Sequence, residues 1–483
     1  MGSPKENLLS VVSTGIGGLD RVLEGGFPRN SLIVLAGNPG TGKTIFSAQF
    51  LYCGAVDHDE GGVYVSFAED HESFIQNMRN FGFDFKRLEE EGKFSFLEFL
   101  TMEKEAASTI VNMILREISK INAKRLVIDS YSALAQMLEK PLEARKFLHT
   151  ILGKITRLLG CTTLLIVEIP FGQERIGLGI EGFVADGILQ LRAGRLEGRL
   201  YRDLLIRKMR GVEVKEERLG FTLHGGFKVF TPFKMKTPER KEAFKPVPNP
   251  PGRFTSCSES LDRLLGGGWP QSSTVLLEIG ENVSALEYHL LIVPTGCNFL
   301  ARESGVIVIP SSGIDYNIVW SQATGSGLPK EILEKYLRVC IFRTLATVKK
   351  PWLIKLDGEN AIEDFQSLGR LARSFIELTG KPPLWIVGTD SLIMQYGLEE
   401  AVKLLSIGAT MIREARALGF FILKPGYPRT VSQLLNSIVD IHLKIVREHG
   451  ALILYGLKPR TCLNFLEADF SKGCPLPKLT PIR

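Results

Sequence analysis

The sequence predicts an α/β protein built from two related domains, each with a mainly parallel sheet flanked by helices. Three observations predict it. Short β-rich runs alternate with helical patterns, a glycine-rich loop follows the first run, and a turn-rich segment of the first half returns in the second. The chain has 483 residues with 44% hydrophobic content, which is too long for one ordinary core.

The glycine-rich loop lies between the apolar run 32–35 and a helical pattern that begins at Ile45. Glycine lets successive backbone N–H groups face a polyphosphate, a lysine reaches terminal phosphates, and a hydroxyl can bind Mg²⁺. The strand before the pattern and the helix after it distinguish a phosphate-binding loop from a chance turn. The expected nucleotide-binding residues are Gly37, Asn38, Pro39, Gly40, Thr41, Gly42, Lys43 and Thr44.

The alternation of patterns places further elements in the first copy. Strands are expected at Ser31–Ala36, Val63–Phe67, Arg125–Asp129, Thr162–Glu168 and Gly187–Leu191, with later antiparallel strands at Tyr201–Met209 and Phe227–Phe230. Helices are expected at about Thr44–Val56, Glu72–Asn80, Glu105–Ile121 and Leu142–Leu159.

Acidic residues follow two of these expected strands. Asp129 ends an apolar strand, and an acid at a carboxyl strand end beside a phosphate loop can hold Mg²⁺ together with Thr44. Glu69 follows the strand 63–67 and is the candidate to orient or deprotonate an attacking water. The alternative roles are those of helix caps, since Asp and Glu are common at helix starts.

The duplication is visible in the segment before the loop. Leu19, Asp20 and Arg21 return as Leu261, Asp262 and Arg263, and in both copies a glycine pair and an aromatic-Pro pair follow. The Pro-rich segment between the copies predicts an extended linker. We therefore expect domains at 1–230 and 255–483, with a linker at 231–254.

The second copy has lost the residues that bind phosphate. Leu276–Leu286 stands in place of the loop and contains no Gly-Lys-Thr, and Gly305–Ser312 aligns with Gly62–Glu69, which puts serine where Glu69 stands. Trp385–Ser391 resembles the strand that ends at Asp129. The sequence predicts a domain that does not bind triphosphate tightly.

In the first copy, six motifs resemble the KaiC-like ATPases of the RecA/RadA superfamily over about residues 8–230. They are Thr14–Asp20, the loop, Ala68-Glu69, Asp129-Ser130, Gly179–Gly187 and Lys208–Gly211. The resemblance implies tandem RecA-like P-loop NTPase domains, of which the first binds ATP with Mg²⁺ and the second is degenerate.

The resemblance also implies a homohexameric ring in which ATP lies between neighbouring subunits. Lys208 and Arg210 would then reach a neighbour's phosphates as an arginine finger does; alternatively, they belong to a solvated strand edge. Family members usually carry two adjacent glutamates where Ala68 and Glu69 stand, so slow hydrolysis is expected. Autokinase activity, which resides in the second domain of KaiC, is not expected.

Three functions remain open from sequence. The first is a slowly hydrolysing ring ATPase that acts as a regulatory or signalling switch, with a protein partner on the second domain. The second is a RecA/RadA-like DNA-binding recombination or repair ATPase, and the third is an ATP-binding scaffold with negligible turnover. Nucleic acid is not favoured, because the loop 169–179 carries one arginine beside Glu174.

Composition narrows the setting. The net charge of +6 comes from 59 basic and 53 acidic residues, which is near balance. The 7 cysteines form no C-x-x-C pair, and no apolar run reaches membrane-spanning length, so neither a zinc site nor a membrane segment is predicted. The start of the chain shows no signal-peptide pattern, and we expect a cytoplasmic protein.

Overall fold

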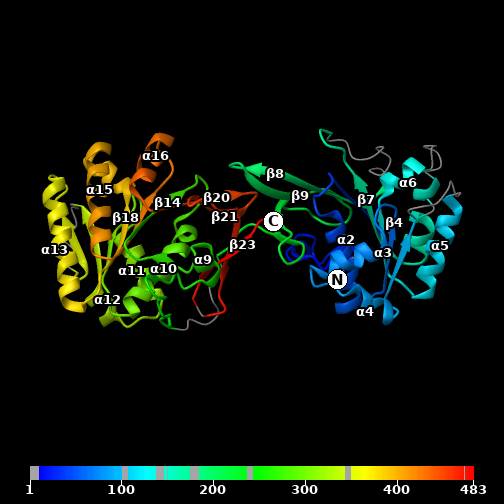
Figure 1. The fold of residues 1–483 in the computed structure, drawn as a ribbon, viewed down its shortest axis with the longest axis horizontal. Coiled ribbons are helices and arrows are strands. Elements are labelled where there is room, and N and C mark those ends of the chain that lie inside the picture. The colour runs from blue at the N-terminus through cyan, green and yellow to red at the C-terminus, as the bar shows by residue number, and fades with distance from the viewer. Residues whose placement is uncertain are drawn as a thin grey trace, which may run out of the picture. The chain divides into compact units, whose positions relative to one another are not determined.

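The computed structural model describes residues 10–99, 107–137, 146–149, 151–173, 184–235, 243–342, 350–472 and 474–483. Its contacts divide the chain into two compact units (Figure 1). The first unit runs to Pro232 and includes Ile482–Arg483, and the second comprises Phe233–Pro481. Each unit has its own sheet and its own apolar core.

The first unit is built on a sheet that has nine strands among the described residues, in the order β11-β10-β9-β8-β3-β7-β6-β4-β5. Neighbours from β8 to β5 are parallel, and β9, β10 and β11 continue the sheet antiparallel. The strands are β3 Leu32–Gly37, β4 Gly62–Ser66, β5 Phe94–Glu98, β6 Arg125–Asp129, β7 Thr162–Glu168, β8 Gly187–Leu196, β9 Arg199–Met209, β10 Arg218–Thr222 and β11 Lys228–Phe230. A separate ribbon pairs β1 (Val11–Val12) with β2 (Phe27–Pro28).

Helices cover both faces of this sheet (Figure 1). One core cluster joins the sheet to α2, α3 and α4, and another joins its opposite face to α5 and α6. The helices are α1 Leu19–Val22, α2 Lys43–Asp57, α3 His71–Arg79, α4 Phe85–Glu90, α5 Ala107–Lys120, α6 Tyr131–Met137 and the π-helix η1 Ile151–Leu158. The predicted α/β class with a mainly parallel, helix-flanked sheet is confirmed.

The expected elements of the first copy are present within a few residues wherever the structure describes them. Of the expected helix 142–159, residues 142–145 and 150 lie outside the described residues, and 151–158 form η1. The sequence prediction omitted several short elements, among them β5, α4, β10 and α6. Each of these four has seven residues or fewer, so hydrophobic periodicity has too few positions to show.

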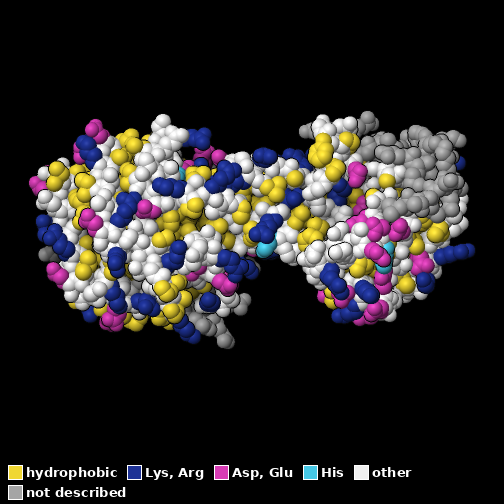
Figure 2. Space-filling model, viewed as in Figure 1, with side chains coloured by type: hydrophobic (Ala, Val, Ile, Leu, Met, Phe, Trp, Pro, Cys, Tyr) yellow, Lys and Arg dark blue, Asp and Glu magenta, His cyan; other side chains and the backbone are white. Residues whose placement is uncertain are grey.

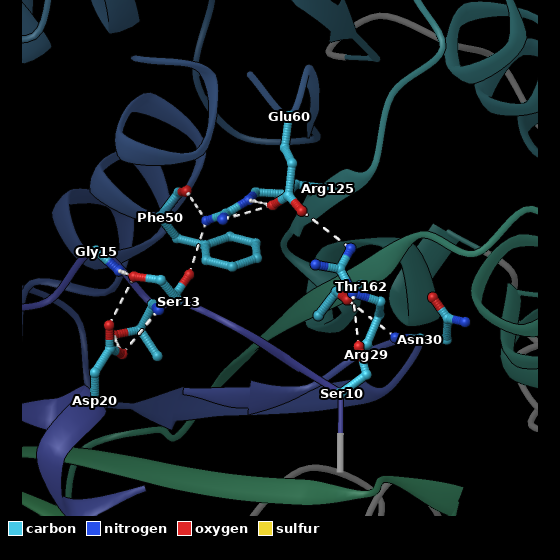
Figure 3. Close-up of polar contacts among 11 residues, drawn as sticks. Ser10, Ser13, Gly15, Asp20, Arg29, Asn30, Phe50, Glu60, Arg125 and Thr162 are labelled. Carbon is cyan, nitrogen blue, oxygen red and sulfur yellow. Dashed lines mark hydrogen bonds and ion pairs between the residues drawn. The ribbon is translucent and has the colours of Figure 1, made fainter. Parts of the chain in front are cut away.

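A buried arginine ties the N-terminal turn to the sheet (Figure 3). Arg125, the first residue of β6, is 0% exposed and donates two hydrogen bonds to Glu60, at 2.9 and 2.7 Å. It also donates to the carbonyls of Ser13 and Phe50, at 2.9 and 2.7 Å. Because a buried charge is tolerated only when it is paired, these contacts fix α2 and the chain before it against β6.

The second unit has a sheet of ten strands among the described residues, in the order β17-β16-β15-β18-β19-β14-β20-β21-β22-β23. The strands are β14 Ser273–Ile279, β15 Val306–Ile309, β16 Leu337–Phe342, β17 Leu353–Leu356, β18 Leu384–Gly388, β19 Leu418–Leu423, β20 Ile441–Glu448, β21 Ala451–Lys458, β22 Asn464–Asp469 and β23 Leu476–Pro481. A small ribbon pairs β12 (Arg253–Phe254) with β13 (Trp269–Pro270).

The helices of the second unit also lie on both faces of its sheet (Figure 1). On one face are α9 Glu259–Leu264, α10 Ala285–Ala301, α11 Tyr316–Gly325 and α12 Lys330–Tyr336. On the other are α13 Ala361–Thr379, α14 Thr389–Tyr396, α15 Leu398–Glu414 and α16 Arg429–Ile438.

The two units repeat one design. Apart from β17, their sheets have the same strand order, and the turn before the first strand repeats its hydrogen bonds. The N–H of Thr14 donates to Asp20 at 2.8 Å, and that of Ser256 donates to Asp262 at 2.8 Å. The duplication seen in the sequence is therefore a duplication of structure.

The strand registers give residue-by-residue equivalences. The N–H of Leu32 donates to Asp186, and that of Thr274 donates to Asp440. Carried across the paired strands, this match makes Val306 the counterpart of Gly62 and Gly388 the counterpart of Asp129. The sequence alignment of Gly305 with Gly62 is therefore one residue off within the strand, because pairing rather than spacing fixes the register.

Within the Pro-rich segment the structure describes residues 231–235 and 243–254, and residues 243–254 lie along the second unit. Phe244 is 7% exposed and packs with Cys257, Cys297 and Leu476. Val247 exchanges two hydrogen bonds with the Asn298 side chain, at 2.8 and 3.1 Å. Residues 236–242 lie outside the described residues.

Candidate nucleotide site

The glycine-rich loop connects the end of β3 to the start of α2 at the carboxyl edge of the sheet. Gly42 has a φ of +101°, and a Cβ there would lie 2.8 Å from the Leu223 side chain, so both the backbone conformation and the space require glycine. The Asn38 side chain donates to the carbonyls of Ile169 and Pro170, which ties the loop to the turn after β7. The loop therefore connects a strand to the start of a helix, as expected from the sequence, and places backbone N–H groups at that helix start.

Lys43 folds back over the loop. Its Nζ donates to the carbonyls of Gly37 and Asn38, both at 3.0 Å, and the residue is 7% exposed. Burial lowers the pKa of Lys43, while the negative charges of Glu168 and Asp129 act in the opposite direction. The amine thus lies between the loop and two acidic strand ends.

Thr44 and Asp129 meet as the sequence predicted. The Thr44 hydroxyl donates to Asp129 Oδ2 at 3.2 Å, and the Tyr64 hydroxyl donates to the same oxygen at 2.6 Å. Burial raises the pKa of Asp129, and the hydrogen bonds from Tyr64 and Thr44 oppose that rise. The result is a hydroxyl and a carboxylate side by side at the loop.

Tyr64 was missed by the sequence analysis. It is 1% exposed in the middle of β4, and burial together with the Asp129 charge raises its pKa well above the usual range. It therefore stays a hydrogen-bond donor. The available signal was a tyrosine between Val63 and Val65 in a buried strand, since a buried phenol needs a polar partner.

Glu69 lies at the turn from β4 into α3. Its backbone N–H donates a hydrogen bond to Ser66 Oγ at 2.9 Å, and its carboxylate accepts one from the Asn77 side chain at 2.8 Å. Its charge also contributes to raising the pKa of Tyr64, so it belongs to the same cluster. Ala68 beside it is exposed.

Lys208 and Arg210 are not near the loop of their own chain. Lys208 donates to the carbonyl of Ala185 at 2.7 Å, and Arg210 pairs with Asp186 at 3.1 Å. Asp186 in turn accepts from the N–H of Leu32, the first residue of β3, whereas the loop follows the last. The two cations therefore lie at the opposite edge of the sheet from the phosphate loop.

The donor set limits which ligands fit. Within the part of the chain that the structure describes, no group of three or more His, Cys, Asp or Glu side chains could hold a metal ion by itself. Thr44 and Asp129 provide two oxygen ligands, which fits Mg²⁺ when phosphate oxygens and water complete its coordination. In the described regions, no helix is long and apolar enough to cross a bilayer.

In the second unit, the connection that corresponds to the phosphate loop has the same length but lacks the residues that bind phosphate. Both helices start at equivalent positions, α2 at Lys43 and α10 at Ala285, so alanine replaces the lysine and Leu286 replaces Thr44. The first turn of α10 is capped by its own residues, because the Glu287 carboxylate accepts a hydrogen bond from the N–H of Ser284 at 2.8 Å. Only the first unit carries a phosphate loop among the described residues.

A phosphate loop on a parallel sheet, followed by a strand that ends in an acid, defines the class of P-loop nucleotide-binding domains. The family profile of the KaiC ATPase matches residues 12–232, and that of GvpD basic region 2 matches residues 243–352. The chain belongs to the KaiC-like ATPase family through its first unit.

Relatives of the first half are UPF0273 proteins. One from Methanocaldococcus jannaschii is 36% identical over 227 residues, covering 44% of this chain and 92% of the relative. Another, from Pyrococcus furiosus, is 38% identical over 230 residues, covering 44% and 90%. A crystal structure of a KaiC-like protein from Pyrococcus horikoshii is 37% identical, covers 46% of this chain and 99% of that chain, and has a TM-score of 0.42.

Proposed function

We propose that the chain is a Mg²⁺-dependent, slowly hydrolysing ATPase that works as a nucleotide-dependent regulatory switch, with its first unit as the only ATP site. The observation that carries the proposal is the convergence of Lys43, Thr44 and Asp129 at one end of β3. In this fold that edge is where phosphates bind.

The chain's own groups suggest how ATP is held. Lys43 exchanges the carbonyls of Gly37 and Asn38 for phosphate oxygens, which suit a buried amine better because they are charged. The N–H groups of the loop and the start of α2 bind the remaining oxygens. Thr44 and Asp129 hold Mg²⁺, which supplies positive charge against the phosphates.

Slow hydrolysis follows from the residues after β4. Glu69 is the acid close to the cluster, but its carboxylate is already held by Asn77, and Ala68 offers no second acid. A base that activates water contributes about 10²–10⁴-fold in rate. Because the Glu69 carboxylate is partly occupied by Asn77, we expect turnover to fall while ATP binding stays intact.

A ring explains where Lys208 and Arg210 act. Since they lie at the opposite edge from their own loop, they can serve only the ATP of a neighbouring copy. We propose a homohexamer in which each subunit offers its loop to one neighbour and these two cations to the other. The second unit, without a phosphate loop, is then available for a protein partner, and autokinase activity is not expected from it.

The recombination function has less support. On the face of the second unit shown in Figure 2, Lys and Arg side chains are dispersed among apolar and acidic ones, whereas a DNA-binding surface gathers them. Phe171 in the turn after β7 is 77% exposed and could stack on a base, but the loop 174–183 lies outside the described residues.

Phosphate release tests the proposal with three variants. We expect slow, Mg²⁺-dependent release by the wild type, none by Lys43→Ala or by Arg210→Ala, and wild-type rates for Lys215→Ala, an exposed lysine of the same unit. Mixing the two inactive variants should restore part of the activity, because an intact loop then meets an intact Arg210 across an interface. Background rates in the wild type would favour the scaffold instead.

Oligomeric state and DNA binding complete the test. Mass photometry should show a ring with ATP, and a monomer under all conditions would remove the role of Lys208 and Arg210 in a neighbour's site. Single-stranded DNA binding with a steep salt dependence would favour the recombination ATPase over the switch.

A further inference from the structure

The second unit has a pocket of about 510 Å³ at the carboxyl edge of its sheet. Its apolar wall includes Ile279, Val283, Pro425 and Tyr427, and its polar groups include Asp390 and Lys424. Small-molecule sites occupy about 300–1,000 Å³ and combine an apolar wall with a few polar groups. By the strand registers, this is the place that the nucleotide site holds in the first unit.

The charges at this place are changed, not merely removed. In the first unit, Gly37 pairs with Glu168 on the neighbouring strand. In the second unit, the equivalent strand pair ends at Glu278 and Leu423, so Lys424, the next residue, takes the place of Glu168 and a cation replaces the acid. Asp390 lies in the first turn of α14, two residues after the end of β18, whereas Asp129 is the last residue of β6 in the first unit. The second unit therefore presents one acid and one lysine at this edge, from other positions than the Lys43, Asp129 and Glu168 of the first unit.

Asp390 is buried with half of its carboxylate unused. The residue is 1% exposed, and its Oδ2 accepts from the N–H of Ser312 at 2.8 Å and from the Ser312 hydroxyl. Its Oδ1 is buried and has no hydrogen-bond partner within the described residues. Such an oxygen costs about 1–3 kcal/mol unless a donor reaches it, so the pocket lacks a cationic or N–H donor at this point.

Two further buried hydroxyls lie in the same region of the second unit as Asp390. Tyr288 Oη and Ser311 Oγ also have no hydrogen-bond partner among the residues that the structure describes. Burial raises the pKa of Tyr288 to about 12, with a contribution from the Asp390 charge and an opposite one from Ser311, so the three groups are neighbours. Together they can accept several hydrogen bonds from one ammonium group.

Lys424 supplies the opposite charge close by. Its Nζ donates to the carbonyl of Ser312 at 2.6 Å, while the N–H of the same residue donates to Asp390. Lys424 and Asp390 are therefore both bonded to Ser312. Val283 and Ala285 bring the first turn of α10, a helix of 17 residues, to the same pocket. Because Glu287 already caps this turn, the positive charge that favours a carboxylate here is that of Lys424.

We propose that this pocket binds a small zwitterion of the α-amino-acid type with an apolar side chain. The ligand's ammonium group donates to Asp390 Oδ1, its carboxylate meets Lys424, and its side chain lies against Ile279, Val283 and Tyr427. A triphosphate does not fit, because neither the glycine-rich loop nor its lysine is present here and the Asp390 carboxylate would repel the phosphates. A metal ion does not fit either, since Asp390 is the only carboxylate among the described residues that line the pocket.

The test uses the full chain without nucleotide and the twenty standard L-amino acids as probes. Thermal shift identifies binders, and calorimetry measures the affinity of the best one against its deaminated and decarboxylated analogues. We expect at least one apolar amino acid to bind and both analogues to bind at least about 10-fold more weakly, since each lacks one charge-assisted contact.

Variants locate the site. Asp390→Asn, which keeps the shape, and Lys424→Met should each weaken binding by about 10-fold or more, while Glu281→Gln, an exposed acid of the neighbouring loop, leaves it unchanged. If Asp390→Asn fails to fold, Lys424→Met decides alone. The proposal is overturned if no amino acid binds at millimolar concentration, or if binding survives both substitutions. ATP binding by the first unit is measured separately and does not enter either outcome.

Discussion

Replacing Tyr64 by Phe removes one hydroxyl and nothing else from the candidate Mg²⁺ site. The Asp129 carboxylate then loses the 2.6 Å bond from Tyr64 and keeps the 3.2 Å bond from Thr44. Partners of this kind typically matter by about 10–100-fold in metal affinity, because they orient the ligand. We therefore expect Tyr64→Phe to weaken Mg²⁺-dependent ATP binding by about 10-fold or more.

The pH dependence gives the sharper signature. The Tyr64 bond lowers the pKa of Asp129 against the burial that raises it, so its removal raises that pKa further. Mg²⁺ binds the ionised carboxylate; its affinity therefore rises with pH through this pKa, and in Tyr64→Phe the rise should occur at higher pH.

The assay is a Mg²⁺ titration of ATP binding at a series of pH values upward from about 4, the usual pKa of an aspartate. Tyr52→Phe is the control, since Tyr52 packs on Phe83 and Phe85 in the same unit and makes no contact with Asp129. If Tyr64→Phe shows the Mg²⁺ affinity and pH profile of Tyr52→Phe, the assigned role of Tyr64 is refuted.

Two further predictions concern stability. Arg125→Met leaves Glu60 without its buried partner and should cost about 3–5 kcal/mol in urea unfolding of the first unit, whereas Arg29→Met removes a 38% exposed partner of the same acid and should cost about 0–1 kcal/mol; equal costs would contradict the network in Figure 3. Glu278 is partly buried, which opposes ionisation, but hydrogen bonds led by that of His442 hold its pKa at about 2. The ionised carboxylate therefore stabilises the fold by about 3 kcal/mol above pH 4.5, and this stabilisation is lost as the pH falls towards 2. Glu278→Gln should remove that part of the acid dependence, and an unchanged acid transition would contradict it.

What the sequence predicted well was encoded locally. The loop Gly37–Thr44 and the strand that ends at Asp129 are short patterns in which each residue type has one geometric purpose, and the structure brings Thr44 and Asp129 within 3.2 Å of each other. The duplication was visible for the same reason, because a turn held by its own Asp20 keeps its residues together in sequence.

What the sequence did not show depends on contacts between distant residues. Tyr64 and Asp129 meet because β4 and β6 are neighbours in register, and Arg125 is buried because Glu60 and the N-terminal turn converge on it. The one-residue slip in the alignment of Gly305 with Gly62 has the same origin, since strand pairing fixes the register. The exchange of Glu168 for Lys424 became visible only after that register was known.

The central claim is that this duplicated chain has one working phosphate loop, and ATP stoichiometry tests it most directly. Calorimetric titration with Mg²⁺ and ATP should give a single site per chain in the wild type and none in Lys43→Ala, with Lys215→Ala binding as the wild type does. Two sites per chain, or ATP binding that survives in Lys43→Ala, would contradict the account.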